Sequence, residues 1–222
     1  MSMISNFPRL LKGAIVALDS NAAQIVSTIP FQFNPETLTR TLQVFAATEG
    51  ETDRSESLRI KGAPKETIRL EVEFDSTGPL SDSDQKTAVE VGIYAQLSAL
   101  ETLIYPQSSH VKQVMQQADR GILEIAPLEA PMSLLVWGKK RILPVRLTDF
   151  SITEEAYDVN LNPIRAKVSL SLQVLNYDHL PWNQRGSKLF LAHHQEKERL
   201  AKRGSIPYSQ NLTGVGRDNI LL

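Results

Sequence analysis

The sequence predicts a mainly β protein, in which a β-barrel or β-sandwich carries one flanking α-helix and a C-terminal helical arm. Two observations lead to this prediction. Apolar and polar residues alternate over long stretches, without an error in residues 164–174. A helical spacing of apolar residues replaces the alternation once in the main body, between residues 87 and 105, and Pro106 stops it.

The expected strands are short at the start of the chain and long toward its end. Residues 68–74 alternate apolar residues with Arg and Glu, so one face is buried and the other meets water or a charged partner. In residues 164–174 the parity places Leu170 inside and Ser171 on the opposite side. Within residues 142–157 the apolar parity slips by one, which indicates a bulge or corner near residues 148–149. The complete set of expected strands is 12–18, 25–33, 38–44, 68–74, 132–137, 142–157 and 164–174.

A polar stretch without apolar periodicity separates two of these strands at residues 46–61. We expect a mobile loop there, because the stretch is too polar to bury against its own domain. A long loop inside a compact domain usually has a function, which here would be contact with a neighbouring subunit. The candidates for this contact are the charged residues Glu49, Glu51, Asp53, Arg54 and Glu56.

The pattern of strands ends near Tyr177, which predicts two parts, a β domain over residues 1–178 and an arm over residues 179–222. Ser187 is a candidate N-cap for a helix that runs to about residue 202. Its apolar residues form only a weak stripe among many charges, so we expect the arm to pack on something outside the barrel.

The composition excludes several classes of function. With 24 basic and 25 acidic residues, the formal net charge of −1 gives no electrostatic footprint for nucleic acid. The chain has no cysteine, which excludes disulfides, thiolate nucleophiles and cysteine-ligated metals. The first residues lack a signal-peptide pattern, and no stretch reaches the roughly 20 apolar residues of a membrane span. We therefore expect a protein that is folded in the cytoplasm, without nucleic-acid binding or membrane insertion.

No arrangement of residues in the sequence indicates catalysis, a cofactor or a metal. His193 and His194 are adjacent, so on a helix they diverge and are expected to be solvated rather than to share a metal. Glu71 and Glu73 share one strand face, which is more typical of an ion-pair ladder than of an acid–base pair. Residues 138–141 (GKKR) lack the pattern of a phosphate-binding loop and are interpreted as a basic hairpin tip.

Five strings of the sequence together resemble the tube protein family of contractile injection systems, the phage-tail-like machines whose baseplates carry tail-tube homologues. They occur in the family's order and cover about three quarters of the chain. The strings are FQFNPETLTR (31–40), PKETIRLEVEFD (64–75), YAQLSALETLIYP (94–106), VWGKKRILPVRL (136–147) and FSITEEAYDVNLNPIRAKVSLSLQVL (150–175).

This resemblance implies a fold of the tail-tube type and a structural, non-enzymatic role in the baseplate. Six copies would form a ring that joins the spike or hub to the inner tube and initiates tube assembly. The implied partners are the chain itself, the spike or hub protein, and the inner tube protein or a second tube initiator, with sheath and wedge proteins as further candidates. The chain would assemble in the cytoplasm as part of an injection particle.

The residues that carry the resemblance are interpreted as markers of the fold. Asn34-Pro35 and Asn162-Pro163 are expected to fix turns, Gly138 to serve a tight turn and Trp137 to fill the core, while Glu155 and Arg165 face each other as a candidate ion pair. The full set of markers is Phe33, Asn34, Pro35, Trp137, Gly138, Pro144, Glu155, Asn162, Pro163 and Arg165.

The sequence departs from many family members in one respect, because no LysM peptidoglycan-binding pattern follows Tyr177. Two alternatives to a tube initiator stay open. The first is a baseplate or sheath-junction adaptor that does not nucleate the tube. The second is a wall-directed glycan-binding or hydrolase module, for which the sequence offers neither an aromatic cleft nor a catalytic constellation.

Overall fold

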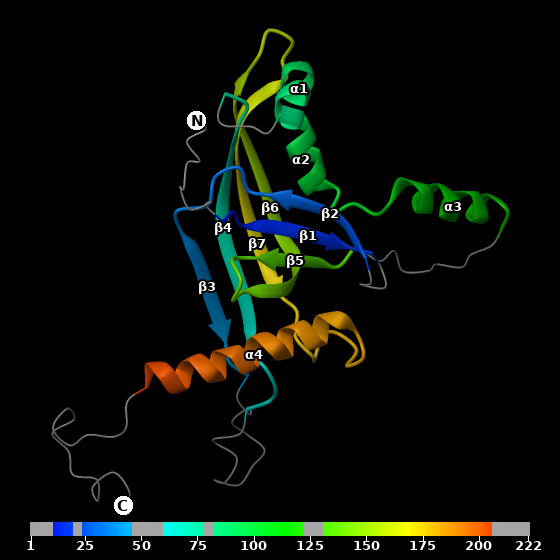
Figure 1. Cartoon of the computed structure of the whole chain (residues 1–222). Coiled ribbons are helices and arrows are strands. Elements are labelled where there is room, and N and C mark those ends of the chain that lie inside the picture. The colour runs from blue at the N-terminus through cyan, green and yellow to red at the C-terminus, as the bar shows by residue number, and fades with distance from the viewer. Residues whose placement is uncertain (1–10, 20–23, 46–59, 78–81, 122–130, 206–222) are drawn as a thin grey trace, which may run out of the picture.

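The computed structural model describes residues 11–19, 24–45, 60–77, 82–121 and 131–205 (Figure 1). The strands are β1 (Ala14–Leu18), β2 (Ile25–Pro30), β3 (Leu38–Gln43), β4 (Lys65–Asp75), β5 (Ser133–Val136), β6 (Ile142–Tyr157) and β7 (Pro163–Val174). The helices are α1 (Asp82–Val91), α2 (Tyr94–Glu101), α3 (Ser108–Asp119) and α4 (Arg185–Gly204). The fold is thus mainly β, as the alternation of the sequence predicts.

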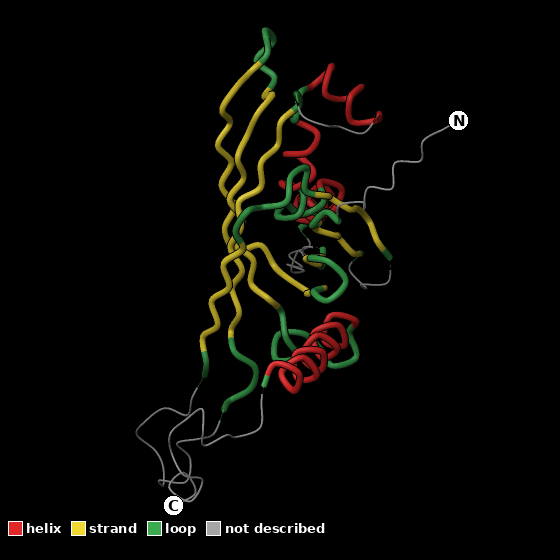
Figure 2. The backbone as a smooth tube through the Cα atoms, turned by 60° about the vertical axis from the view of Figure 1, so that its left-hand side comes forward, coloured by secondary structure: helices red, strands yellow, loops and turns green. Residues whose placement is uncertain are grey.

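The described strands form one antiparallel sheet of seven strands in the order β2-β1-β5-β6-β7-β4-β3. Strand β6 connects its two halves, since residues 142–145 pair with β5 and the rest of the strand pairs with β7. The register shifts between Leu147 and Asp149, which confirms the bulge expected from the slipped parity. This bulge lets the sheet turn, and the short strands β1, β2 and β5 lie on one side of the long ones (Figure 2).

The hydrophobic core fills the space between the long strands and the elements on that side. Ile15 and Phe31 reach it from the β1–β2 region, Leu70 and Leu172 from the long strands, and Leu97 from α2. The exposed face of the long strands carries polar residues instead, as the alternating burial of β4 requires. The face that is buried is therefore the one that the sequence parity predicts.

The helical region differs from the single helix expected over residues 87–105. It is broken at Gly92, whose φ of 61° is left-handed, so that α1 and α2 are separate helices. The Ile93 N–H donates to the Pro163 carbonyl at 2.8 Å, and a Cβ on Gly92 would lie 2.1 Å from that oxygen. The break therefore lets the helical region wrap closely over the start of β7, and glycine is needed there. Helix α3 follows in a segment where the sequence pattern was ambiguous.

Helix α4 begins two residues before the predicted cap and packs on the β domain itself. Phe190 belongs to the main core and Leu189 packs against a smaller cluster formed around Val16, Leu18 and Leu134. Ser187 is fully buried, and its hydroxyl donates to the carbonyls of Leu180 and Pro181 instead of capping the helix. The expectation that this helix packs on something outside the barrel is wrong, since its second half also contacts the domain through Lys197 and Glu66.

Candidate assembly site

The sheet has two unpaired edges in the described part of the chain, β2 at one end of the strand order and β3 at the other. Each edge strand is six residues long, and each pairs with a neighbour on one side only. An edge strand presents a row of unsatisfied backbone N–H and C=O groups, which can add a further strand. These two edges are therefore the first candidate for contacts between subunits.

Both edges also expose large apolar side chains. Ile25 and Val26 of β2 are about two-thirds exposed, and Leu42 of β3 is 47% exposed, followed by exposed Val44 and Phe45. The Lys61 N–H donates to the Phe45 carbonyl at 3.0 Å, so the β3–β4 hairpin continues past Gln43. Apolar side chains along an unpaired edge are typical of a surface that a partner covers.

Edge strand β3 is tied to α4 through a buried carboxylate. Glu66 of β4 is only 3% exposed and accepts from Arg40 Nε at 2.6 Å and from Lys197 Nζ at 3.3 Å. Its burial alone raises the pKa of Glu66, but Arg40 and Lys197 outweigh burial and hold that pKa below its ordinary value. These three residues, the Glu66 cluster, fasten the edge strand, its neighbour and the helix together.

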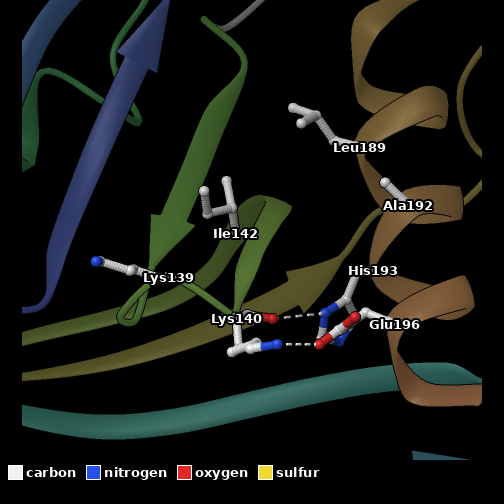
Figure 3. Close-up of a pocket in the computed structure, with 7 residues that line it drawn as sticks. All are labelled: Lys139, Lys140, Ile142, Leu189, Ala192, His193 and Glu196. Carbon is white, nitrogen blue, oxygen red and sulfur yellow. Dashed lines mark hydrogen bonds and ion pairs between the residues drawn. The ribbon is translucent and has the colours of Figure 1, made fainter. Parts of the chain in front are cut away.

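A shallow groove of about 350 Å³ lies between α4 and the turn from β5 to β6 (Figure 3). His193 Nδ1 lies 3.3 Å from the Lys140 carbonyl oxygen, and Lys140 forms an ion pair with Glu196. Hydrogen bonds from Arg199 and Lys140 lower the pKa of Glu196 to about 2. Polar contacts thus hold the middle of α4, whereas apolar contacts hold its start.

His193 corrects the expectation that both adjacent histidines are solvated. Its Nε2 atom is buried without a hydrogen-bond partner among the described residues. Burial lowers the pKa of His193, and the positive charge of Lys197 lowers it further, so the ring is neutral near pH 7. His194 does lie at the surface, 3.7 Å from Glu198 one turn later.

We expect Glu66→Gln to lower the free energy of unfolding by about 1–3 kcal/mol at pH 7, because two charge-assisted hydrogen bonds lose their anion. The pKa of Glu66 is lowered in the folded state, so its contribution is present above about pH 4.5 and disappears as the pH falls further. The difference between wild type and variant in urea unfolding should therefore shrink from pH 7 to pH 3. The charged or titratable groups around Glu66 are Arg40, Arg141, His193 and Lys197. A difference that stays constant with pH would contradict the assigned role of Glu66.

The markers in the β2–β3 loop hold the start of the domain together. Asn34 Oδ1 accepts from the Gly13 N–H and Asn34 Nδ2 donates to the Leu11 carbonyl, both at 2.8 Å. Pro35 follows in the same loop, and Phe33 is partly exposed rather than part of the core. Asn34 therefore holds the backbone that precedes β1 against the β2–β3 loop.

Three further markers, Trp137, Gly138 and Pro144, lie in or next to the β5–β6 turn. Trp137 packs at the border of the core with its ring centroid 6.4 Å from that of Phe31. Gly138 has a φ of 69°, which suits a tight turn. Pro144 is buried in β6, and its carbonyl accepts from the Leu175 N–H at 2.8 Å.

The tip of the β6–β7 hairpin is built by Asp158 and Asn162. The Asp158 carboxylate accepts from the backbone N–H groups of Asn160 and Asn162 and from the Asn162 side chain at 2.7–2.9 Å. Leu161 adopts a φ of 64°, unusual for a residue with a side chain. Pro163 is the first residue of β7, and its carbonyl accepts the hydrogen bond from the Ile93 N–H, next to Gly92. The turn that Asn162 and Pro163 form is thus rigid and anchored to the helices.

The expected ion pair between Glu155 and Arg165 is wrong. Arg165 pairs with Asp75 at 2.7 Å, and Glu155 pairs with Lys167 at 2.9 Å. A register irregularity between Glu154 and Ala156 takes Glu155 out of the ladder, so that Arg165 lies opposite Ala156. The sequence offered no signal for this second irregularity.

The residues that the sequence suggested for subunit contact lie outside the described residues; they are Glu49, Glu51, Asp53, Arg54 and Glu56.

The buried residue Glu66 was not predicted from the sequence. A signal for it exists, since it is an acidic residue on the same parity as buried Ile68, Leu70 and Val72. A charge on the apolar parity of a strand predicts a buried ion pair.

Within the described residues, no group of three or more His, Asp or Glu side chains is placed to hold a metal ion. No described helix combines the length and apolar character that crossing a membrane requires. What the described surface does offer is strand edges, exposed apolar side chains and charged ends, all of which suit contacts with other proteins.

The family model described as contractile injection system tube protein matches residues 9–179. The chain belongs to the contractile injection system tube protein family, a family of structural components. No curated protein sequence matches it.

Three matches to chains of solved structures all have TM-scores below 0.3. A chain in the tail of an empty gene transfer agent particle, computed with C6 symmetry, has a TM-score of 0.29 and 10% identity, covering 73% of this chain and 90% of that one. A chain in the virion of the native gene transfer agent particle gives the same values. A chain in the six-fold symmetrised baseplate of the anti-feeding prophage has a TM-score of 0.25 and 14% identity, covering 79% of this chain and 94% of that one.

Proposed function

We propose that the chain forms a ring in the baseplate of a contractile injection system, where the ring joins the spike or hub to the inner tube and initiates tube assembly. Membership of the tube protein family over residues 9–179 is the observation that carries this proposal. The ring of six copies rests on the resemblance of the sequence to that family. The partners would be the spike or hub, the inner tube protein or a second initiator, and neighbouring sheath or wedge proteins, in a particle assembled in the cytoplasm.

The two sheet edges supply a mechanism for forming the ring. Strand β3 of one copy would pair with β2 of the next, so that the sheet continues across the contact and both sets of backbone groups are satisfied. A contact between two different surfaces of the same molecule closes into a ring when the rotation that relates neighbouring copies is a whole fraction of a full turn. The Glu66 cluster supports this role, because it fixes the edge strand through Arg40 before a neighbour arrives.

Charged substitutions on the edges test this mechanism. Val26→Lys on β2 and Leu42→Lys on β3 should each yield monomers, since an edge lysine disfavours strand addition, while thermal stability stays close to that of wild type. Native mass spectrometry reports the number of copies and circular dichroism reports the fold. Met115→Lys, at an equally exposed apolar residue of α3, is the matched control and should keep the ring. Intact rings in both edge variants would contradict pairing through β2 and β3.

Ring formation and tube initiation are separable properties. A ring that initiates the tube should shorten the lag of inner-tube polymerisation when it is added in small amounts to the tube protein. A ring that binds the tube end without shortening the lag would favour the alternative, an adaptor without a nucleating role.

A further inference from the structure

His193 lies in the middle of α4, where the helix packs against the turn between β5 and β6 (Figure 3). Its Nδ1 atom lies 3.3 Å from the Lys140 carbonyl oxygen. A carbonyl oxygen can only accept a hydrogen bond, so Nδ1 carries the hydrogen of the neutral ring and Nε2 carries the lone pair. The contact with Lys140 therefore selects one tautomer.

The other ring nitrogen of His193 is the place where a second proton would bind. Nε2 is buried and has no hydrogen-bond partner among the described residues. A proton on this atom would create a buried N–H donor without an acceptor and, at the same time, a positive charge. Both are unfavourable in a buried position. The docked position of the ring therefore favours its neutral form.

The charged groups around His193 come from α4, β3, β4 and the β5–β6 turn. Both carboxylates already have partners, because Glu66 accepts from two of the surrounding cations and Glu196 from two others. A protonated ring would add a further cation to a group in which cations already outnumber carboxylates. The cations are Lys197 and Arg199 on α4, Arg40 on β3, and Lys139, Lys140 and Arg141 in the turn; the carboxylates are Glu66 on β4 and Glu196 on α4.

The two halves of α4 are attached to the domain by different kinds of contact. The first half contributes Leu189 and Phe190 to apolar clusters, which do not respond to protonation. In the second half, residues 193–204, no residue is fully buried, and the contacts with the domain come from His193, Glu196 and Lys197. Of these three groups, His193 is the one whose ordinary pKa lies near neutral pH.

We propose that His193 makes α4 a pH-sensitive latch, in which uptake of one proton on Nε2 releases residues 193–204 from the domain while the first half of the helix stays on the core. Release gives the new N–H group access to water and separates the imidazolium from the surrounding cations. It also takes Lys197 away from Glu66, so that the carboxylate beside edge strand β3 keeps only Arg40. The latch is a property of one copy and does not require the ring.

Acidification is the direction that releases the helix. Burial and the charge of Lys197 hold the pKa of His193 below its ordinary value in the docked helix, and release returns it to about 6.5. The released form therefore binds more protons than the docked form below about pH 6.5. The ratio of released to docked helix then rises by up to about tenfold for each pH unit, until the docked ring also takes up a proton.

The two carboxylates do not drive this change. Glu66 and Glu196 both have a pKa below the ordinary value, that of Glu196 being about 2, so they stay ionised at pH 5. A release of α4 between pH 7.5 and pH 5 is therefore attributed to His193.

Two spin labels measure the release directly, because the chain has no cysteine of its own. Gln195→Cys on α4 and Ser151→Cys on β6 replace exposed residues, and labelled protein diluted with unlabelled protein reports the distance within one copy. The distribution of distances between the labels should be narrow at pH 7.5. At pH 5 a broad population should appear, at least about fivefold larger than at pH 7.5.

The variant His193→Asn removes the titration but keeps the donor. Its side-chain Nδ2–H can donate to the Lys140 carbonyl, and an amide takes up no proton in this range. The broad population of this variant should be the same at both pH values. His194→Asn is the matched control, since it replaces the adjacent histidine, which lies at the surface near Glu198, and should behave as the wild type does.

Ring ¹⁵N NMR of the wild type tests the same site without a substitution. His193 should show the Nδ1–H tautomer at pH 7.5 and an apparent pKa below 6.5. If His193→Asn fails to dock at either pH, these spectra and the label distances of the wild type decide.

Three results would overturn the latch. The first is a wild-type distribution that stays narrow at pH 5, the second is a broad population in His193→Asn that grows with acid as in the wild type, and the third is the Nε2–H tautomer of His193 at pH 7.5. All of them leave the proposed ring untouched, because every measurement is made within one copy.

Discussion

Replacement of Leu170 by lysine should unfold the protein. Leu170 is 2% exposed in the middle of β7, in the core between the long strands and the short ones. A lysine there would bury a charge without a partner, at a cost of several kcal/mol, which is comparable to the whole stability of a domain. Circular dichroism at 25 °C should show loss of the β signal, or a strongly lowered Tm.

The neighbouring residue Ser169 provides the matched control. It points to the opposite, exposed face, where its hydroxyl lies 3.5 Å from the Glu71 carboxylate, so Ser169→Lys should leave Tm nearly unchanged. Ser171 also has the polar parity, yet it is 8% exposed next to the β6 bulge and is a poorer control. Equal destabilisation by Leu170→Lys and Ser169→Lys would contradict the assigned faces of β7.

Replacement of Gly92 by alanine should cost about 2–5 kcal/mol of unfolding free energy. A left-handed backbone with a side chain costs about 1–2 kcal/mol, and overpacking a close contact adds about 1–3 kcal/mol. Both apply to Gly92, because its φ is 61° and its new Cβ would lie 2.1 Å from the Pro163 carbonyl oxygen. The helical region would have to move away from the β6–β7 hairpin.

The variant Gly138→Ala is the control that separates the cost of the left-handed backbone from the cost of the close contact. Its φ is 69°, but a Cβ would meet no atom within 4 Å, so Gly138→Ala should cost only the backbone contribution. Urea unfolding of both variants measures the difference. A loss for Gly92→Ala no larger than that for Gly138→Ala would mean that the contact with Pro163 does not hold the helical region in place.

The strands were largely predictable, because the apolar or polar character of each residue indicates which face of the strand it lies on. Burial alternates in β4 and, from Ala166 to Leu170, in β7 as the apolar parity requires, and the slip in the parity located the bulge at Leu147–Asp149. Alternation is a local property, and it determines which side of a strand faces the core. The helical period likewise marked residues 87–105, but it gave no signal for α3.

The features that sequence reasoning missed depend on residues far apart in the chain. The helix breaks at Gly92, which lies against Pro163, more than seventy residues later in the chain. Arg165 forms its ion pair with Asp75 on the neighbouring strand β4 rather than with Glu155 across the hairpin. The second half of α4 is too polar to predict docking, but its Lys197 meets Glu66 on β4. Such contacts follow from the topology, which the alternation of residues does not specify.

The candidate site was predictable only through the resemblance of the sequence to a family. The family match stands, whereas the two open edges, β2 and β3, emerged from the strand order alone. No local signal distinguishes an edge strand from a central one when both are short, and exposed Val26 and Leu42 have the same residue types as core residues.

A cryo-EM reconstruction of the assembled injection particle tests the proposed function most directly. We expect one ring of six copies of this chain, coaxial with the spike and directly below the first ring of the inner tube, with the sheet continuing from β3 of each copy to β2 of the next. Copies located away from the tube axis, or a number of copies that is not twice that of a trimeric spike, would contradict it.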